Sequence, residues 1–119
     1  MNEQPSSAIM VLITTKSREE AVRLAEMLVN SRLAACVQIL PEIESIYFWK
    51  DKVERQPETL LIAKTVEAKF DELQREVTAR HSYETPEIIA LPIINASVPY
   101  LEWLSSITKS PPQPANNTA

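Results

Sequence analysis

One stretch of the sequence limits the possible folds more than any other: a long run of strand-forming residues between positions 34 and 66. Residues 34–49 read AACVQILPEIESIYFW and residues 59–66 read TLLIAKTV, both dense in β-branched and aromatic side chains. Asp51 favours a tight turn, so this run is predicted to form a long β-hairpin with its tip at residues 50–52. Pro41 and Pro57 cannot donate to a ladder of hydrogen bonds and are predicted at bulges or on strand edges.

The segments on either side of this hairpin alternate between strand-like and helix-like patterns. Residues 9–15 and 87–94 are apolar runs of strand length, whereas residues 17–32 and 66–81 carry apolar stripes of helical period. Ser17 is predicted to cap the first helix, with Glu20 completing a capping box. A short last helix is predicted over residues 100–108, with Trp103 in the core. This order predicts an α+β ferredoxin-like βαββαβ sandwich, with two helices on one sheet face and the other face uncovered.

Composition excludes several classes of function. The 119 residues contain no glycine, so a glycine-rich phosphate or dinucleotide loop is excluded, and the net charge of −4 argues against nucleic acid as a partner. No apolar run approaches about 18 residues, so we expect no membrane span. The single cysteine and the absence of a secretory signal pattern favour a cytoplasmic location. We expect a flexible tail over residues 1–8, one domain over residues 9–108 and a disordered proline-rich tail over residues 109–119.

The length of the hairpin indicates that one copy of the chain is not enough. At about 3.3 Å per residue, residues 35–50 extend for roughly 50 Å, whereas a compact domain of this size is about 34 Å across. Tyr47, Phe48 and Trp49 lie near the far end, on both faces of a ribbon that is marginal by itself in water. Another copy of the chain is the simplest cover, so we predict an obligate homo-oligomer in which these three residues form the interface.

Several motifs together resemble the CutA divalent-cation tolerance proteins over about residues 9–104. In order, they are TT after the first strand, RLAACVQILP, SIYFWKDKVE, LLIAKT, HSYETPEIIALPI and YLEWL. The resemblance implies a homotrimer of ferredoxin-like subunits, similar in architecture to the PII signalling proteins, with clefts between neighbouring subunits. Many family members have glycine where this chain has Glu42 and Asp51. Members for which copper binding is proposed have a histidine pair and a cysteine where this chain reads Arg80-His81 and LITT, which weakens a copper site here.

Candidate binding residues cluster after the second helix. His81, Tyr83, Glu84 and Glu87 supply an imidazole, a phenol and two carboxylates within seven residues, a set that suits a divalent cation or a small polar ligand. We assign His81, Glu84 and Glu87 as candidate metal ligands and Tyr83 with Lys64 to a ligand cleft. In the alternative interpretation His81 caps the helix that it follows and Lys64 is a solvated side chain. Cys36 is read as a small core residue rather than a thiolate ligand.

These residues lead to two hypotheses about function. In the first, the chain is a homotrimer that responds to metal ions such as copper and binds a divalent cation, copper or zinc, or a small anionic ligand between its subunits. In the second, it is a scaffold trimer that acts through protein partners. No nucleophile elbow, triad or pair of contrasting carboxylates is evident, so no enzymatic activity is expected; a hydrolase would have to depend on His81 and Glu84.

Overall fold

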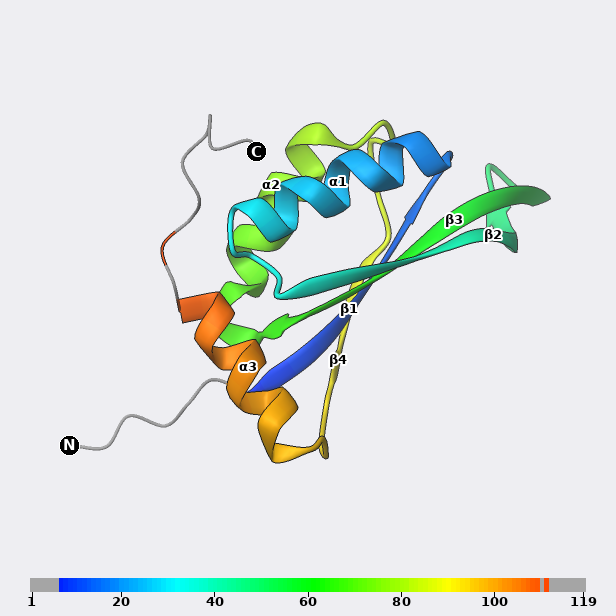
Figure 1. The fold of residues 1–119 in the computed structure, drawn as a ribbon. Coiled ribbons are helices and arrows are strands. Elements are labelled where there is room, and N and C mark those ends of the chain that lie inside the picture. The colour runs from blue at the N-terminus through cyan, green and yellow to red at the C-terminus, as the bar shows by residue number, and fades with distance from the viewer. Residues whose placement is uncertain (1–6, 110, 112–119) are drawn as a thin grey trace.

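The structure, a computed structural model, describes residues 7–109 and residue 111, and its sheet has the predicted ferredoxin-like order. The strands are β1 (Ala8–Thr15), β2 (Cys36–Trp49), β3 (Lys52–Val66) and β4 (Ile88–Pro92), each antiparallel to its neighbours in the order β2-β3-β1-β4 (Figure 1). The α+β class is therefore confirmed. Most of both predicted tails, residues 1–6, 110 and 112–119, lies outside the described residues.

Helices α1 (Arg18–Asn30) and α2 (Phe70–Arg80) cover one face of the sheet, as predicted (Figure 1). A single 3-10 turn, η1 (Glu67–Lys69), leads from β3 into α2. Alternate residues of β1 point at the helices and are buried with apolar residues of α1, α2 and β3, among them Ile9, Val11, Ile13, Leu24, Leu28, Leu61, Leu73 and Val77. No helix in the described part of the chain is long and apolar enough to cross a membrane.

Both ends of α1 follow from local chemistry in a chain without glycine. Ser17 is the N-cap, and its hydroxyl accepts a hydrogen bond from the Glu20 backbone N–H at 3.1 Å. The helix ends two residues before the predicted Arg32. Arg32 itself takes the left-handed conformation usually left to glycine, with φ of 65°, and Leu33 N–H then bonds back to the Leu28 carbonyl at 2.9 Å.

Two expectations about the last helix and the sheet face beside it are wrong. Helix α3 (Val98–Lys109) packs Leu104 against Ala8 and Val66, so one end of the face predicted to be uncovered is in fact covered. Trp103 is not a core residue: it is 41% exposed and contacts the ring of Tyr100. Leu104, the next residue, takes the inward position of this helix and is only 1% exposed.

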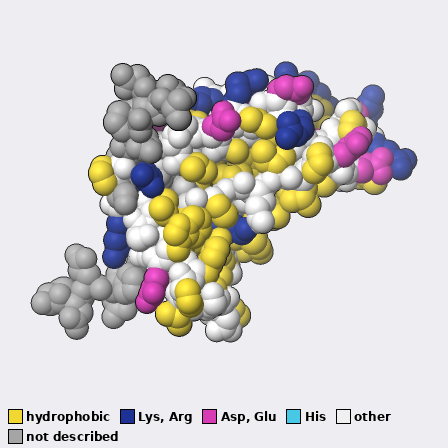
Figure 2. All heavy atoms as spheres, viewed as in Figure 1, with side chains coloured by type: hydrophobic (Ala, Val, Ile, Leu, Met, Phe, Trp, Pro, Cys, Tyr) yellow, Lys and Arg dark blue, Asp and Glu magenta, His cyan; other side chains and the backbone are white. Residues whose placement is uncertain are grey.

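The rest of that face stays open and is largely apolar. Leu40, Ile89 and Leu91 are exposed there, on strands at both edges of the sheet. Figure 2 shows hydrophobic side chains continuing from the centre of the molecule onto the hairpin, whose tip carries charges of both signs. An apolar surface of this extent is typical of a contact with another macromolecule.

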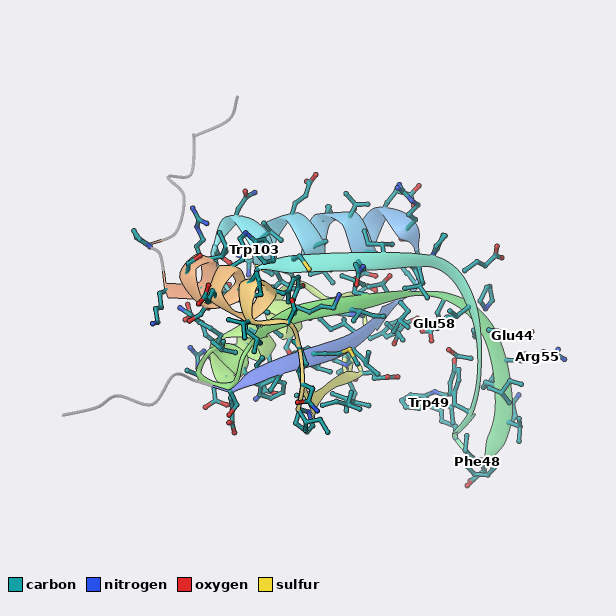
Figure 3. All side chains as sticks on the ribbon, turned by 60° about the horizontal axis from the view of Figure 1, so that its bottom comes forward. Glu44, Phe48, Trp49, Arg55, Glu58 and Trp103 are labelled. Carbon is teal, nitrogen blue, oxygen red and sulfur yellow. The ribbon has the colours of Figure 1, made fainter. Side chains whose placement is uncertain are left out.

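The β2–β3 hairpin extends beyond the body and bends where the sequence places its prolines. The register shifts between Leu40 and Ile43, so Pro41 lies in a bulge as predicted, and Pro57 stands opposite Glu44. Since β1 pairs with β3 only as far as Thr59, the outer hairpin has no third strand beside it. The hairpin curves strongly from this point (Figure 3), and the molecule reaches 53 Å along its longest axis, which confirms the predicted overshoot.

The hairpin tip is a two-residue turn made without glycine. Lys50 and Asp51 both have positive φ, at 52° and 64°. This geometry suits the twist of the flanking strands, and Asp tolerates it better than most residues because its short side chain bonds locally. The turn that Asp51 predicted is therefore confirmed, and Lys50 takes the same left-handed conformation beside it.

Candidate functional site

The concave side of the bent hairpin encloses a groove with a cavity volume of about 520 Å³. Its walls come from three parts of the chain: the end of β1, the outer hairpin, and the loop between α2 and β4. The lining residues are Thr14, Ser45, Ile46, Tyr47, Trp49, Glu58, Tyr83, Glu84, Thr85 and Glu87. In Figure 3, Trp49 and Glu58 point to the inside of the curve, whereas Glu44 and Arg55 lie on its outside. The bend at the two prolines therefore creates the groove.

The loop that forms the groove floor is anchored by the chain's single histidine. The His81 side chain is completely buried, and its Nδ1 accepts a hydrogen bond from the Tyr83 backbone N–H at 3.0 Å. Nε2 therefore carries the proton and donates it to the Thr14 carbonyl at 2.8 Å. Both ring nitrogens are used inside the chain, so His81 fixes the loop against β1 and offers neither nitrogen to a metal ion. It reaches β1 rather than capping its own helix.

A buried carboxylate from α1 holds the same loop from the other side. Glu20 is only 2% exposed, and its carboxylate accepts hydrogen bonds from Ser82 N–H at 2.7 Å and Ser82 Oγ–H at 3.0 Å. Its backbone N–H still bonds the Ser17 cap, but its side chain binds Ser82 in place of completing the predicted capping box. Burial by itself raises the pKa of Glu20, but the two bonds from Ser82, the nearby His81 and the Lys16 backbone together outweigh burial and lower the pKa.

Tyr83 connects the loop to the hairpin. Its hydroxyl donates a hydrogen bond to the Glu58 carboxylate at 2.6 Å, and its ring leans against that of His81 with centroids 4.9 Å apart. Burial, followed by the bond to Glu58, raises the pKa of Tyr83, so the phenol stays protonated and continues to donate. This bond ties the floor of the groove to the point at which the hairpin bends.

Replacing Tyr83 with phenylalanine should lower the free energy of unfolding by about 1.5 kcal/mol, because it removes a hydrogen bond to a charged, half-buried carboxylate. Urea unfolding followed by circular dichroism measures the change. Tyr47→Phe is the matched control, since Tyr47 lines the same groove and its hydroxyl has no hydrogen bond within the described residues. Equal losses in the two variants would contradict the importance of the Tyr83–Glu58 bond.

The structure brings together only part of the set predicted from the sequence. Tyr83, Glu84, Glu87, Tyr47 and Trp49 line the groove. Other predicted residues lie elsewhere: Phe48 points to the outer side of the hairpin, His81 lies below the floor, and Lys64 Nζ bonds Gln38 Oε1 on the open sheet face. Cys36 is half-buried beside α3, with its sulfur 3.5 Å from the Tyr100 hydroxyl.

The side chains that the structure describes in a single chain do not fit a metal centre. No three His, Cys, Asp or Glu side chains among residues 7–109 and 111 converge closely enough to hold a metal ion. The predicted set of His81, Glu84 and Glu87 fails because the imidazole is enclosed by its own hydrogen bonds while both glutamates are exposed. A metal ion bound here would need ligands from more than one copy of the chain.

Sequence reasoning missed the residues that build the site from below. Glu20 was assigned only to a helix cap, and Glu58 and Ser82 were not singled out. A glutamate at an inward position of an amphipathic helix indicates a buried polar contact, because a buried carboxylate needs a hydrogen-bonding or charged partner. The Glu58–Tyr83 bond has no such signal, since the two residues lie in different elements, 25 positions apart.

Comparison with known proteins gives a consistent result. The profile of a family described as CutA1 divalent ion tolerance protein matches residues 9–107. The chloroplastic protein CutA 1 of Oryza sativa subsp. japonica is 46% identical over 102 residues, covering 86% of this chain and 58% of that protein. The divalent-cation tolerance protein CutA of Thermus thermophilus is 46% identical over 99 residues, covering 83% of this chain and 96% of that protein.

A solved structure shares the fold as well. The periplasmic divalent cation tolerance protein CutA of Archaeoglobus fulgidus matches with a TM-score of 0.83 at 40% identity, over 85% of this chain and 98% of that one. The chain spans less than three fifths of the length of the two plant relatives with which it shares 46% identity.

Proposed function

Because this chain belongs to the CutA1 divalent ion tolerance family, we propose that it acts in tolerance to divalent cations such as copper. In this proposal the chain forms a PII-like homotrimer. The trimer binds a metal ion or a small ligand in the clefts between its copies and does not catalyse a reaction. The groove under the hairpin is the part of that cleft supplied by one chain. A cytoplasmic location stays a prediction, since relatives carry chloroplastic and periplasmic names.

One observation carries this proposal: the hairpin reaches past the body and leaves large apolar side chains in water on both of its faces. Phe48 is 70% exposed on the outer face and Trp49 is 54% exposed on the inner face. Burying one such side chain stabilises an assembly by about 1.5–3 kcal/mol. The hairpin curves toward its own body but leaves the groove between them, so the chain alone does not shelter these residues.

The open sheet face supports the same conclusion. Ile89 and Leu91 lie exposed on β4, an edge strand of the described sheet, and Leu40 lies exposed on β2, the other edge strand. Unprotected apolar edges tend to pair with further strands, and a closed trimer removes that tendency. The groove then lies next to the neighbouring copy, which would complete its walls.

Sedimentation velocity at micromolar concentration tests assembly, and calorimetric titration with Cu²⁺ and Zn²⁺ tests the metal. We expect three times the mass of one chain. We also expect metal binding only in the assembled protein, because the described residues of one chain do not bring three metal ligands together. A folded monomer at these concentrations would overturn the trimer and its shared clefts together. A trimer that binds neither a metal ion nor any small molecule would leave assembly standing and remove the ligand.

A further inference from the structure

We infer that the groove under the hairpin takes an organic cation, an amine or guanidinium compound with an apolar framework. This inference rests on the proposal that the groove is a ligand site and names the class of ligand. It differs from a chelated metal ion and from the anionic ligand suggested by the sequence. Its basis is the combination of aromatic walls, unpaired carboxylates and an interior too wide for a single ion.

Aromatic side chains form part of the groove wall. Tyr47, Trp49 and Tyr83 all line the groove, and they reach it from two separate segments of the chain. The faces of such rings attract cations, tryptophan most strongly and guanidinium or alkylated ammonium groups in particular. Trp49 already has a cation near its ring, because Lys50 Nζ lies 5.9 Å from the ring centroid.

The groove also carries negative charge. Its lining includes Glu58, Glu84 and Glu87 but no lysine, arginine or histidine. Within the described residues Glu84 and Glu87 have neither an ion pair nor a hydrogen bond from a side chain, and the partner of Glu58 is the neutral phenol of Tyr83. Three negative charges in one concave surface favour a cationic ligand and oppose an anion.

Carboxylates outside the groove show that this lack of cationic partners is local. On the outer face of the same hairpin, Glu44 forms an ion pair with Arg55, with Nε and Oε2 2.6 Å apart. On α2, Glu76 pairs with Arg80. Among residues 7–109 and 111, cations thus pair with glutamates on exposed surfaces outside the groove, and none pairs with the glutamates inside it.

The size of the groove separates an organic cation from a metal ion. A volume of about 520 Å³ lies within the range of small-molecule sites, roughly 300–1,000 Å³. The three glutamates do not converge as a metal site requires. Separated carboxylates around aromatic walls instead suit a molecule whose apolar part contacts the rings while its charged nitrogens reach different carboxylates.

Isothermal titration calorimetry with agmatine in about 0.15 M salt tests this inference. Agmatine carries a guanidinium and an ammonium group on a four-carbon chain, and N-butylurea is its neutral counterpart. We expect one agmatine per chain with a Kd below about 1 mM, and at least tenfold weaker binding of N-butylurea. The double variant Glu84→Gln/Glu87→Gln should weaken agmatine binding at least tenfold. Trp49→Leu should weaken it at least fivefold while the protein keeps its oligomeric state.

The matched control is Glu26→Gln/Glu72→Gln, which removes the same charge from exposed positions on α1 and α2 and should change the Kd less than twofold. Equal loss in the two double variants, or equal affinity for both compounds, would overturn the inference. If agmatine fails while Cu²⁺, Zn²⁺ or inorganic phosphate binds at the groove, the ligand class is wrong but the ligand cleft remains. If no compound binds, the cleft itself is refuted.

Discussion

Replacing Glu20 with alanine should lower the free energy of unfolding by about 3 kcal/mol, one of the two largest effects expected in this chain. The change removes the acceptor of two hydrogen bonds from Ser82, and bonds to a charged partner contribute about 1.5–3 kcal/mol each. It also leaves a space under the loop that carries Tyr83 to the groove. Urea unfolding at neutral pH measures the loss.

Glu19→Ala is the matched control, since Glu19 lies in the same helical turn but is exposed. Losing a favourable charge at a helix N-terminus costs about 0.3–1 kcal/mol, so the control should lose much less. Glu20→Gln keeps one acceptor oxygen and should fall between the two. A loss in Glu20→Ala no greater than in Glu19→Ala would contradict the anchoring role of Glu20.

Acid provides a second measurement of the same carboxylate. The pKa of Glu20 is lower in the folded chain than in the unfolded chain, where it is close to the ordinary value of about 4.3. Its stabilising contribution is therefore complete above the unfolded pKa and is lost as the pH falls through the lower folded pKa. The stability difference between the native chain and Glu20→Gln should shrink over that acidic window and stay constant at neutral pH.

The double variant Phe48→Ser/Val53→Ser should convert the proposed trimer into single chains at micromolar concentration. The two side chains stand opposite each other on the outer face of the hairpin, and both are strongly exposed in one chain. If the neighbouring copy covers them, the variant loses about 3 kcal/mol or more per chain from the interface. Sedimentation velocity reports the change as a threefold fall in mass.

The matched control for this variant is Val29→Ser/Ile94→Ser, which removes two exposed apolar side chains away from the hairpin. It should keep the mass of the native assembly. Circular dichroism distinguishes dissociation from unfolding, because the substituted side chains contribute little to the core of one chain. An unchanged mass in Phe48→Ser/Val53→Ser would show that the outer face of the hairpin is not an interface.

Much of the fold could be predicted because its signals are local. The Ser17 cap, the bulge at Pro41 and the turn at Asp51 each depend on the chemistry of a few neighbouring residues, and all three are confirmed. Trp103 was placed wrongly because the apolar stripe of a short helix is narrow. The sequence places Leu101, Leu104 and Ile107 on that stripe, and Trp103 beside the stripe was also counted into the core although its side chain is 41% exposed.

The site was harder to predict because its decisive contacts join distant segments. Sequence spacing put His81, Glu84 and Glu87 in one cluster, but proximity along a loop does not fix the direction of a side chain. His81 turns under the loop to bond Thr14, 67 positions away, while the glutamates face the groove. Tyr47 and Trp49 were predicted as interface residues from their place near the far end of a long aromatic hairpin. Their role in walling the groove depends on the bend at Pro41 and Pro57.

The bend also has a consequence for how the chain becomes ordered. From Lys52 to Glu58 the backbone of β3 pairs only with β2. The outer hairpin is therefore a two-stranded ribbon with little to hold it in place in one chain. Its amide protons should therefore exchange with solvent far sooner than those of β1. Where copies of the chain assemble, the ribbon becomes fully ordered only as the copies associate. The ordered fraction of the ribbon then depends on protein concentration.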